Sequence, residues 1–217
     1  MLIIGAKGFA KELLQLLLDN GQAENFAFFD DVNVEMPEIL FGKYPLLKNE
    51  LQAKEYFNHI DNRFCLGLGS SHLRYKLAMK FESWGGVLTS TISNQANVSI
   101  LEVQIGTGTN IMSNAVISPS VKIGEGSLIY FHTSITHDCV LGKFVEISPS
   151  ATVLGRAVIG DFTQIGAGAI ILSDIKIGNN VLVGAGAVVT KDIPDNAVVA
   201  GVPARIIRFQ DGFKVYH

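Results

Sequence analysis

Four side chains that can bind or transfer protons lie within fifteen positions of the chain, at His132, His137, Asp138 and Glu146. His137 directly precedes Asp138. A carboxylate beside an imidazole orients the ring and increases its basicity, as a general base requires. Such a base could deprotonate an amine or a hydroxyl. Spacing alone is equally compatible with an ordinary surface histidine, so both interpretations stay open.

A second candidate group lies at the N-terminus, where IIGAKGFAKELL predicts a strand, a glycine turn and a helix. Gly5 and Gly8 lie in the turn, and Ala10 occupies the third glycine position of the dinucleotide fingerprint. The backbone N–H groups and the helix dipole could hold a phosphate there, and Lys7 could add a positive charge. Asp30 follows Gly8 by 22 residues, near the place of the ribose-binding acid. A tight turn with a solvated Asp30 is the alternative.

The elements that position this loop alternate between strand and helix patterns. MLII and NFAFFDD predict two parallel strands joined by the helix KELLQLLLDNG, and FCLGLG predicts a third strand. A helix over residues 71–82 and a short strand over 86–88 follow. This order predicts a small Rossmann-like α/β domain over residues 1–92. It offers one mononucleotide half rather than two, which favours a nucleotide-linked substrate over NAD.

The elements that position His137 repeat every six residues from Ile105 to Pro194. Each block opens on Ile, Val or Leu, and the residue four positions on is small or aliphatic. This period is typical of a parallel β-helix in which three blocks close one coil of eighteen residues. Frequent glycine and β-branched residues exclude a helical array. We expect glycine at the second block position to permit the corner conformations.

The repeat also locates the polar residues. His137 is the third residue of its block, outside the inward positions, so we expect it to reach solvent. Gly155 lies eighteen residues, or one coil, beyond it. The predicted β-helix domain covers residues 93–217, and the segment DNAVVAGVPARIIRF predicts a turn or strand that caps the open end of the prism.

Composition restricts the class of function. A net charge of −3 without a long basic run argues against a nucleic-acid partner. No apolar run approaches the roughly 20 residues that span a bilayer, so we expect no membrane insertion. No targeting segment is recognised, and we expect a cytoplasmic protein. The two cysteines, Cys65 and Cys139, do not form a disulfide framework and are expected to be buried thiols.

Several segments together resemble a known family. The hexapeptide array, THDCVLGKFVEISPSA, KIGNNVLVGAGAVVTKDIPDNAVVAGVPAR and IIGAKGFAKELL are similar to the sugar O- and N-acyltransferases related to the sialic acid O-acetyltransferases and the UDP-4-amino-sugar N-acetyltransferases of bacterial glycan synthesis. The resemblance covers nearly the whole chain. It implies a left-handed parallel β-helix after the Rossmann-like domain, a homotrimer, and acetyl-CoA bound in the cleft between neighbouring prisms.

The resemblance also implies roles for residues of the β-helix. His137 corresponds to the catalytic base and Asp138 to the acid that increases its basicity, with direct transfer and no acyl-enzyme. The N–H of Gly155 corresponds to the donor for the oxyanion. Further implied acetyl-CoA contacts are Ala167, Ala185 and Glu146. Many members have a second histidine at the position of Glu146, and a contact with a substrate ammonium is the alternative for this residue.

In the N-terminal domain the resemblance implies a nucleotide-sugar site. Its contacts correspond to Lys7, Gly8, Phe9, Asp30, Asp31 and Gly69. Many members have Ser or Gly at the position of Lys7 and His at that of Phe9, so the acceptor sugar is left open.

Four functions follow as hypotheses. The first is acetyl-CoA-dependent acetylation of the amino group of a nucleotide-linked amino sugar. The second is O-acetylation of a sialic acid or similar sugar, which would leave the glycine loop without a nucleotide. A zinc hydratase between subunits would need three well-spaced histidines, and the repeat contains only His132 and His137, so we expect no metal. A non-catalytic scaffold is the fourth.

Overall fold

The computed structural model describes residues 1–22, 25–33 and 35–210 of the 217-residue chain. The chain forms two compact units, Met1–Asn94 and Gln95–His217. This division falls two residues after the boundary expected from the end of the alternating pattern.

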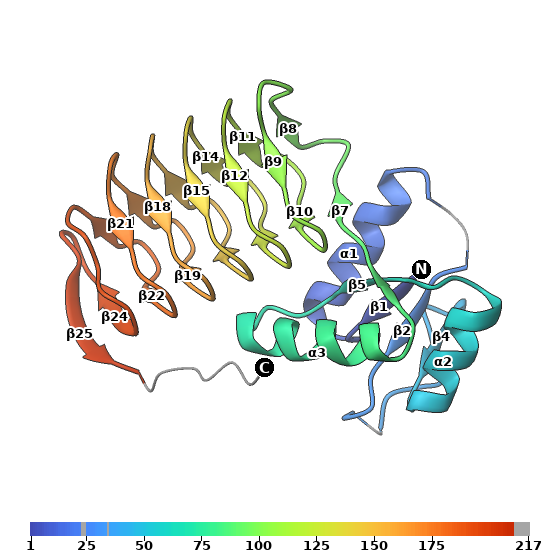
Figure 1. The fold of residues 1–217 in the computed structure, drawn as a ribbon. Helices are drawn as coiled ribbons and strands as arrows, with labels where there is room; N and C mark the ends of the chain where they lie inside the picture. Colours follow the sequence, from blue (N-terminus) through green and yellow to red (C-terminus); the bar gives the residue numbers. More distant parts are fainter. Residues whose placement is uncertain (23–24, 34, 211–217) are drawn as a thin grey trace. The chain divides into compact units, whose positions relative to one another are not determined.

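The N-terminal unit contains a six-stranded sheet of order β3-β4-β2-β1-β5-β6 (Figure 1). All neighbouring strands are parallel except β3 and β4, which form an antiparallel hairpin. The strands are β1 (Leu2–Ile4), β2 (Ala27–Phe29), β3 (Ile39–Leu40), β4 (Tyr44–Leu47), β5 (Arg63–Leu66) and β6 (Val87–Leu88). The predicted strands and their parallel order are confirmed. The hairpin was not predicted.

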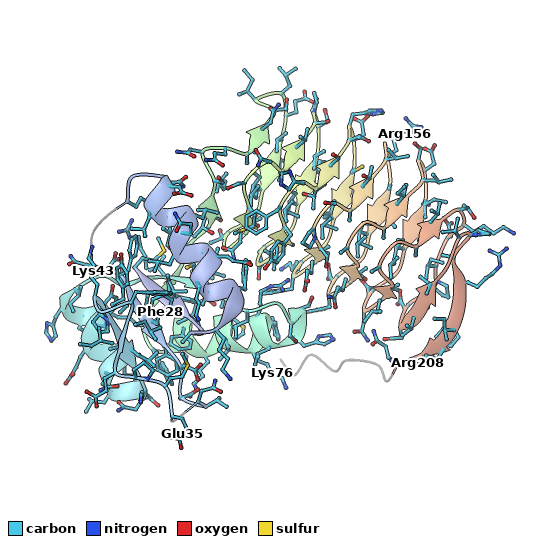
Figure 2. The ribbon with its side chains drawn as sticks, turned by 180° about the vertical axis from the view of Figure 1, so that it is seen from behind. Phe28, Glu35, Lys43, Lys76, Arg156 and Arg208 are labelled. Carbon is cyan, nitrogen blue, oxygen red and sulfur yellow. The ribbon has the colours of Figure 1, made fainter. Side chains whose placement is uncertain are left out.

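Three helices cover this sheet: α1 (Gly8–Asp19), α2 (Glu50–His59) and α3 (Ser71–Ser83). The helices α1 and α3 lie on opposite sides of the strands, since α3 is in front in Figure 1 and α1 is in front in Figure 2, seen from behind. Phe57 of α2, Phe64 of β5 and Phe81 of α3 lie within 6.3 Å of one another by ring centroids. These aromatic contacts hold α2 and α3 to one face of the sheet.

The C-terminal unit is a parallel β-helix whose short strands form three faces (Figure 1). The chain passes from face 1 to face 2 to face 3 in each coil. The strands of face 1 are β8 (Asn97–Val98), β11 (Val116–Ile117), β14 (Ser134–Ile135), β17 (Thr152–Val153), β20 (Ile170–Ile171) and β23 (Val188–Val189). Those of face 2 are β9 (Gln104–Ile105), β12 (Lys122–Ile123), β15 (Val140–Leu141), β18 (Val158–Ile159) and β21 (Lys176–Ile177). Those of face 3 are β10 (Asn110–Ile111), β13 (Leu128–Ile129), β16 (Glu146–Ile147), β19 (Gln164–Ile165), β22 (Leu182–Val183) and β24 (Ala197–Ala200).

The interior of the prism consists of aliphatic ladders that confirm the six-residue register. Ile117 pairs with Ile135, Ile135 with Val153, and the same step of eighteen residues links the neighbouring strands of face 1 from β11 to β23. These side chains are at most 1% exposed. Burying one aliphatic side chain stabilises the fold by about 1.5–3 kcal/mol, so the ladders supply most of the stability of this unit.

The glycines at the second block position have a different role from the one expected. A Cβ at Gly124 would lie 2.4 Å from the carbonyl oxygen of Gly142, and a Cβ at Gly160 would lie 2.5 Å from the carbonyl carbon of Gly178. Neither glycine has a positive φ angle. Glycine is therefore needed at the second position because neighbouring coils approach closely, and the expectation of a special corner conformation there was wrong.

The left-handed corner conformation falls instead at the fourth block position, mostly on residues with side chains. Asp138, Arg156 and Asp174 have φ angles of 61°, 64° and 66°. A positive φ is uncommon for such residues, and Asp tolerates it better than most. The corner between face 1 and face 2 therefore presents polar side chains at regular intervals, at Ser120, Asp138, Arg156 and Asp174.

The predicted capping segment forms β24 and a final strand, β25 (Arg205–Phe209), at one end of the prism (Figure 1). The pairing of β24 with β22 is parallel, and that with β25 is antiparallel. The added strand therefore covers the edge of face 3, while all five residues of β25 stay exposed.

Candidate active site

His137 and Asp138 lie at the corner between face 1 and face 2, in the loop from β14 to β15. The Nδ1 atom of His137 is 2.7 Å from Oδ2 of Asp138, and the two side chains are 54% and 52% exposed. With Nδ1 donating to the carboxylate, the neutral ring carries its lone pair on Nε2. Nε2 is then the ring atom that can accept a proton, and the role of His137 as a base stays a prediction.

The imidazole ring of His137 lies directly against the backbone of Gly155 on the next coil. A Cβ at Gly155 would be 2.7 Å from Cε1 and 2.8 Å from Nε2 of His137. The carbonyl oxygen of His137 also accepts a hydrogen bond of 3.0 Å from the N–H of Arg156. Residue 155 must therefore be glycine for the ring to occupy this place.

The N–H of Gly155 is at the third position of its block, which takes no part in the ladders between coils. At Lys143, Asp161 and Asn179 the corresponding N–H donates to a side chain of the next coil, at 2.7–2.8 Å. Within residues 1–22, 25–33 and 35–210, no acceptor receives a hydrogen bond from the N–H of Gly155. It is a backbone donor beside the imidazole that can serve an incoming oxygen.

An ion pair that sequence reasoning missed adjoins this corner. Arg156 donates from Nε and Nη2 to the two carboxylate oxygens of Asp174, at 2.7 and 2.8 Å. Figure 2 shows Arg156 at the outer edge of the prism. The bonds to Asp174 raise the pKa of Arg156, with a smaller contribution from Asp138, and the same bonds lower the pKa of Asp174. The signal was the spacing of eighteen residues that separates Asp138, Arg156 and Asp174.

Glu146 lies on face 3, at the outward position of β16. Its side chain is buried, and Oε1 accepts hydrogen bonds from Ser148 Oγ and Gln164 Nε2, both at 3.2 Å. The carboxylate is thus held by neighbours on its own face, away from the corner of His137.

Ala167 and Ala185 lie one coil apart at the corner between face 3 and face 1, and both are exposed. The carbonyl oxygen of Ala167 accepts a bond of 2.8 Å from the N–H of Gly186. Within one chain, Ala167 and Ala185 therefore occupy a different corner from His137, whereas Gly155 lies beside it. His132 also lies at a corner between face 3 and face 1. Residues 1–22, 25–33 and 35–210 contain no group of three side chains that could hold a metal ion.

The N-terminal unit has a cavity of about 300 Å³ at the carboxyl ends of its parallel strands. The order β2-β1-β5 places the crevice where the chain turns to opposite sides of β1, the usual ligand position in open α/β sheets. The cavity is lined by Gly5, Ala6, Lys7, Gly8, Phe9, Asp30, Asn33, Gly67, Leu68, Gly69, Ser70 and Leu73. Of the predicted contacts, it brings together Lys7, Gly8, Phe9, Asp30 and Gly69.

Asn33 joins the two charged residues of this cavity, and sequence reasoning missed it. Its side-chain amide donates to both carboxylate oxygens of Asp30, at 3.0 and 2.8 Å, and its Oδ1 accepts from Nζ of Lys7. Its position three residues after Asp30, in a loop, was the available signal. Asp31 is not among the lining residues, because its carboxylate pairs with Nζ of Lys80 at 2.8 Å.

Two helices begin at this cavity. Helix α1 has no side-chain cap and no acidic residue in its first turn, whereas Ser70 caps α3 by accepting from the N–H of Leu73. A Cβ at Gly8 would meet no atom within 4 Å, so the space above the start of α1 is open. An uncapped helix N-terminus beside a lysine is suited to an anion such as a phosphate.

Comparisons with known proteins agree with both halves of this description. The PglD N-terminal domain family matches residues 1–81, and the bacterial transferase hexapeptide family matches residues 156–191. No curated protein matches the chain by sequence. Among the described residues, no helix has the length and apolar character to cross a bilayer.

Three solved structures are similar over almost the whole chain. The acetyltransferase domain of PglB from Neisseria gonorrhoeae is 30% identical, with a TM-score of 0.86, and the match covers 95% of this chain and 98% of that one. PerB from Caulobacter crescentus, in complex with CoA and GDP-perosamine, is 30% identical, with 94% and 95% covered and a TM-score of 0.86. WeeI from Acinetobacter baumannii AYE is 30% identical, with 95% and 98% covered and a TM-score of 0.83.

A glycine-loop domain followed by a hexapeptide β-helix thus defines a class of acyltransferases. The chain belongs to the hexapeptide-repeat sugar O- and N-acyltransferase family, and its C-terminal unit is a left-handed parallel β-helix.

Proposed function

We propose that this acyltransferase transfers the acetyl group of acetyl-CoA to the amino group of a nucleotide-linked amino sugar in bacterial glycan synthesis. The observation that carries the proposal is the His137 ring, which is bonded to Asp138 through Nδ1 and lies against the N–H-bearing backbone of Gly155. PerB, a relative at 30% identity, is described in complex with CoA and GDP-perosamine, and the PglB domain in complex with acetyl coenzyme A.

In the proposed reaction, Nε2 of His137 removes a proton from the sugar amine as the amine nitrogen attacks the thioester carbonyl. The N–H of Gly155 donates to the oxygen that becomes negative, and Asp138 stabilises the imidazolium. The carbon–sulfur bond then breaks, and the imidazolium returns its proton to the departing thiolate. Transfer is direct, and no residue of the enzyme is acylated.

The nucleotide part of the substrate would bind in the cavity of the N-terminal unit. Lys7 and the start of α1 at Gly8 and Phe9 would hold the phosphates, because they combine a positive charge with backbone donors. Asp30 would accept from the ribose, and Gly69 would contact the ligand from the loop after β5. Asp31 does not line this cavity and its carboxylate is paired with Lys80, so it would reach the ligand only from outside the cavity.

Acetyl-CoA would contact Gly155 and Glu146, as well as Ala167 and Ala185. Ala167 and Ala185 lie at a different corner from His137, so one site that contains both groups requires two copies of the chain side by side. We therefore propose a homotrimer with acetyl-CoA between neighbouring prisms, acting in the cytoplasm without a metal.

The test is a panel of nucleotide-activated amino sugars incubated with acetyl-CoA, with release of free thiol as the signal. We expect turnover with at least one of them, competition by the matching nucleoside diphosphate, and acetylation of nitrogen in the product. Turnover of a free sialic acid instead, without competition by nucleotides, would favour the O-acetyltransferase.

Replacement of the base tests the mechanism. His137→Ala is expected to abolish transfer while calorimetric titration still shows acetyl-CoA binding. Two structures of the Caulobacter relative carry a histidine replaced by asparagine or alanine and hold both CoA and GDP-perosamine. Retained turnover in His137→Ala would refute the role of the base, and no binding heat in the wild type would favour a scaffold.

A further inference from the structure

The ion pair between Arg156 and Asp174 has no place in the proposed reaction, although it adjoins the proposed base. Asp138, Arg156 and Asp174 occupy the same corner position in three successive coils. The N–H of Arg156 bonds to the carbonyl of His137, and the N–H of Asp174 bonds to that of Gly155, each at 3.0 Å. Because coils are about 4.8 Å apart, Arg156 lies one coil from each of two carboxylates.

The four charged or ionisable side chains at this corner, those of His137, Asp138, Arg156 and Asp174, form two pairs. Asp138 bonds to His137 Nδ1 at 2.7 Å, and Asp174 receives two bonds from Arg156. A guanidinium makes stronger bonds to a carboxylate than a neutral imidazole does, because it is always charged and donates in a bidentate fork. Arg156 is therefore a competitor for Asp138, and its side chain is 54% exposed and is held by its bonds to Asp174.

We propose that Asp174 is a positioning residue of the transfer reaction: it holds Arg156 and so leaves Asp138 to orient His137. Without Asp174, the guanidinium turns back one coil to Asp138. The bond to Nδ1 is then lost, and with it the tautomer and ring orientation that present Nε2 to the substrate. Asp174 would thus control catalysis through Arg156 and touch no substrate. This inference rests on the proposed function of His137.

The test compares Asp174→Asn, Arg156→Gln and the double variant. We expect Asp174→Asn to lower kcat at least tenfold, with both KM values within twofold of the wild type, because binding surfaces are unchanged. Arg156→Gln should be nearly as active as the wild type. The double variant should regain kcat to within threefold of the wild type, because the competitor is gone. No purely structural role of Asp174 predicts this rescue.

A matched control exists on another corner. Lys143 and Glu125 form a similar exposed pair across one coil step, at 3.4 Å, between face 2 and face 3. Glu125→Gln should leave kcat unchanged and should affect the melting temperature about as little as Asp174→Asn does.

Three results would overturn the inference: an Asp174→Asn variant with wild-type kcat, a double variant as slow as the single one, or a Glu125→Gln variant equally impaired. The slow double variant would mean that the charge of Asp174 acts directly on the imidazolium. A crystal structure of Asp174→Asn gives a readout independent of turnover, with Arg156 expected at Asp138. If the wild type acetylates no amino sugar, the proposed function fails, and the crystal structure still decides how these side chains pair.

Discussion

Gly155→Ala is expected to disable the proposed base without disturbing the fold. The added methyl group would lie 2.7 Å from Cε1 and 2.8 Å from Nε2 of His137. Ordinary contact begins at 3.4 Å, so the ring must move by 3.4 − 2.7 = 0.7 Å or more. The ring can move because its side chain is 54% exposed, and the backbone at Gly155 has no positive φ that an alanine would strain.

The size of the effect follows from this displacement. A shift of about 1 Å at a reacting group costs on the order of 100-fold in rate, so we expect kcat to fall between about tenfold and 100-fold. The N–H of residue 155 is kept, and the loss therefore reports the position of His137 rather than the oxyanion donor. The melting temperature should stay within about 1 °C, because no backbone atom has to move.

Gly160→Ala is the matched control, one corner further along the same coil. Its methyl group would lie 2.5 Å from the carbonyl carbon and 2.6 Å from the carbonyl oxygen of Gly178, which are backbone atoms of the next coil. Overpacking of this kind costs about 1–3 kcal/mol, which corresponds to a loss of roughly 2–12 °C in melting temperature for a chain of this size. We expect the folded fraction to keep its kcat.

The assay measures thiol release at saturating acetyl-CoA and sugar, together with calorimetric melting of the two variants. Wild-type kcat in Gly155→Ala would refute the assignment of the reacting group to this corner. Equal melting losses in both variants would refute the claim that the close contact at Gly155 is with a side chain and that at Gly160 with backbone.

Three further predictions concern the other unit and the buried thiols. Lys7→Ala should raise the KM for the nucleotide sugar about tenfold to 100-fold and leave the KM for acetyl-CoA unchanged, since a charged hydrogen bond is worth about 1.5–3 kcal/mol; an unchanged sugar KM would count against the cavity. Burial raises the pKa of Cys65 to about 12 and also raises that of Cys139, so neither thiol should react with a disulfide reagent at pH 8 until the protein unfolds. Burial alone would raise the pKa of Asp61, but hydrogen bonds from Arg63 hold it well below its ordinary value of 3.8. The ionised carboxylate of Asp61 therefore stabilises the folded protein above pH 3.8, and this contribution is lost as the pH falls further. The decrease in melting temperature caused by Asp61→Asn should accordingly be smaller in acid than at pH 7.

The β-helix was predictable because its signal is repeated in every coil. The inward positions of Ile117, Ile135 and Val153 are confirmed by strand pairs at the expected step. The contact of His137 with Asp138 was predictable from adjacency, and that with Gly155 from the coil length. The reason for glycine at the second block position could not be predicted, because the six-residue period does not reveal which residue of a block has a positive φ angle.

Other features depend on tertiary contacts that leave little trace in the sequence. Helix α2 buries only Ala53, Tyr56 and Phe57, so its apolar pattern is too sparse to predict a helix. The pair of Asp31 with Lys80 joins residues 49 positions apart and removes Asp31 from the cavity. To predict the pair of Arg156 with Asp174, one must know the coil register and also that Arg156 bonds to Asp174 rather than to Asp138. The choice between these two carboxylates depends on side-chain rotamers, which the sequence does not reveal.

The backbone contacts of Gly124 and Gly160 with the following coil have a consequence for how such a chain can change length. An insertion of eighteen residues adds one coil to the prism. It displaces all later coils by about 4.8 Å along the axis and leaves each face in register with the same face before the insertion. An insertion of six residues turns all later coils by a third of a revolution, so that corners still lie over corners but each face continues into a different face, and every catalytic corner faces a new neighbour. The β-helix can therefore lengthen by whole coils of eighteen residues, and the corner that carries His137 is unaffected by the number of coils added beyond Asp174.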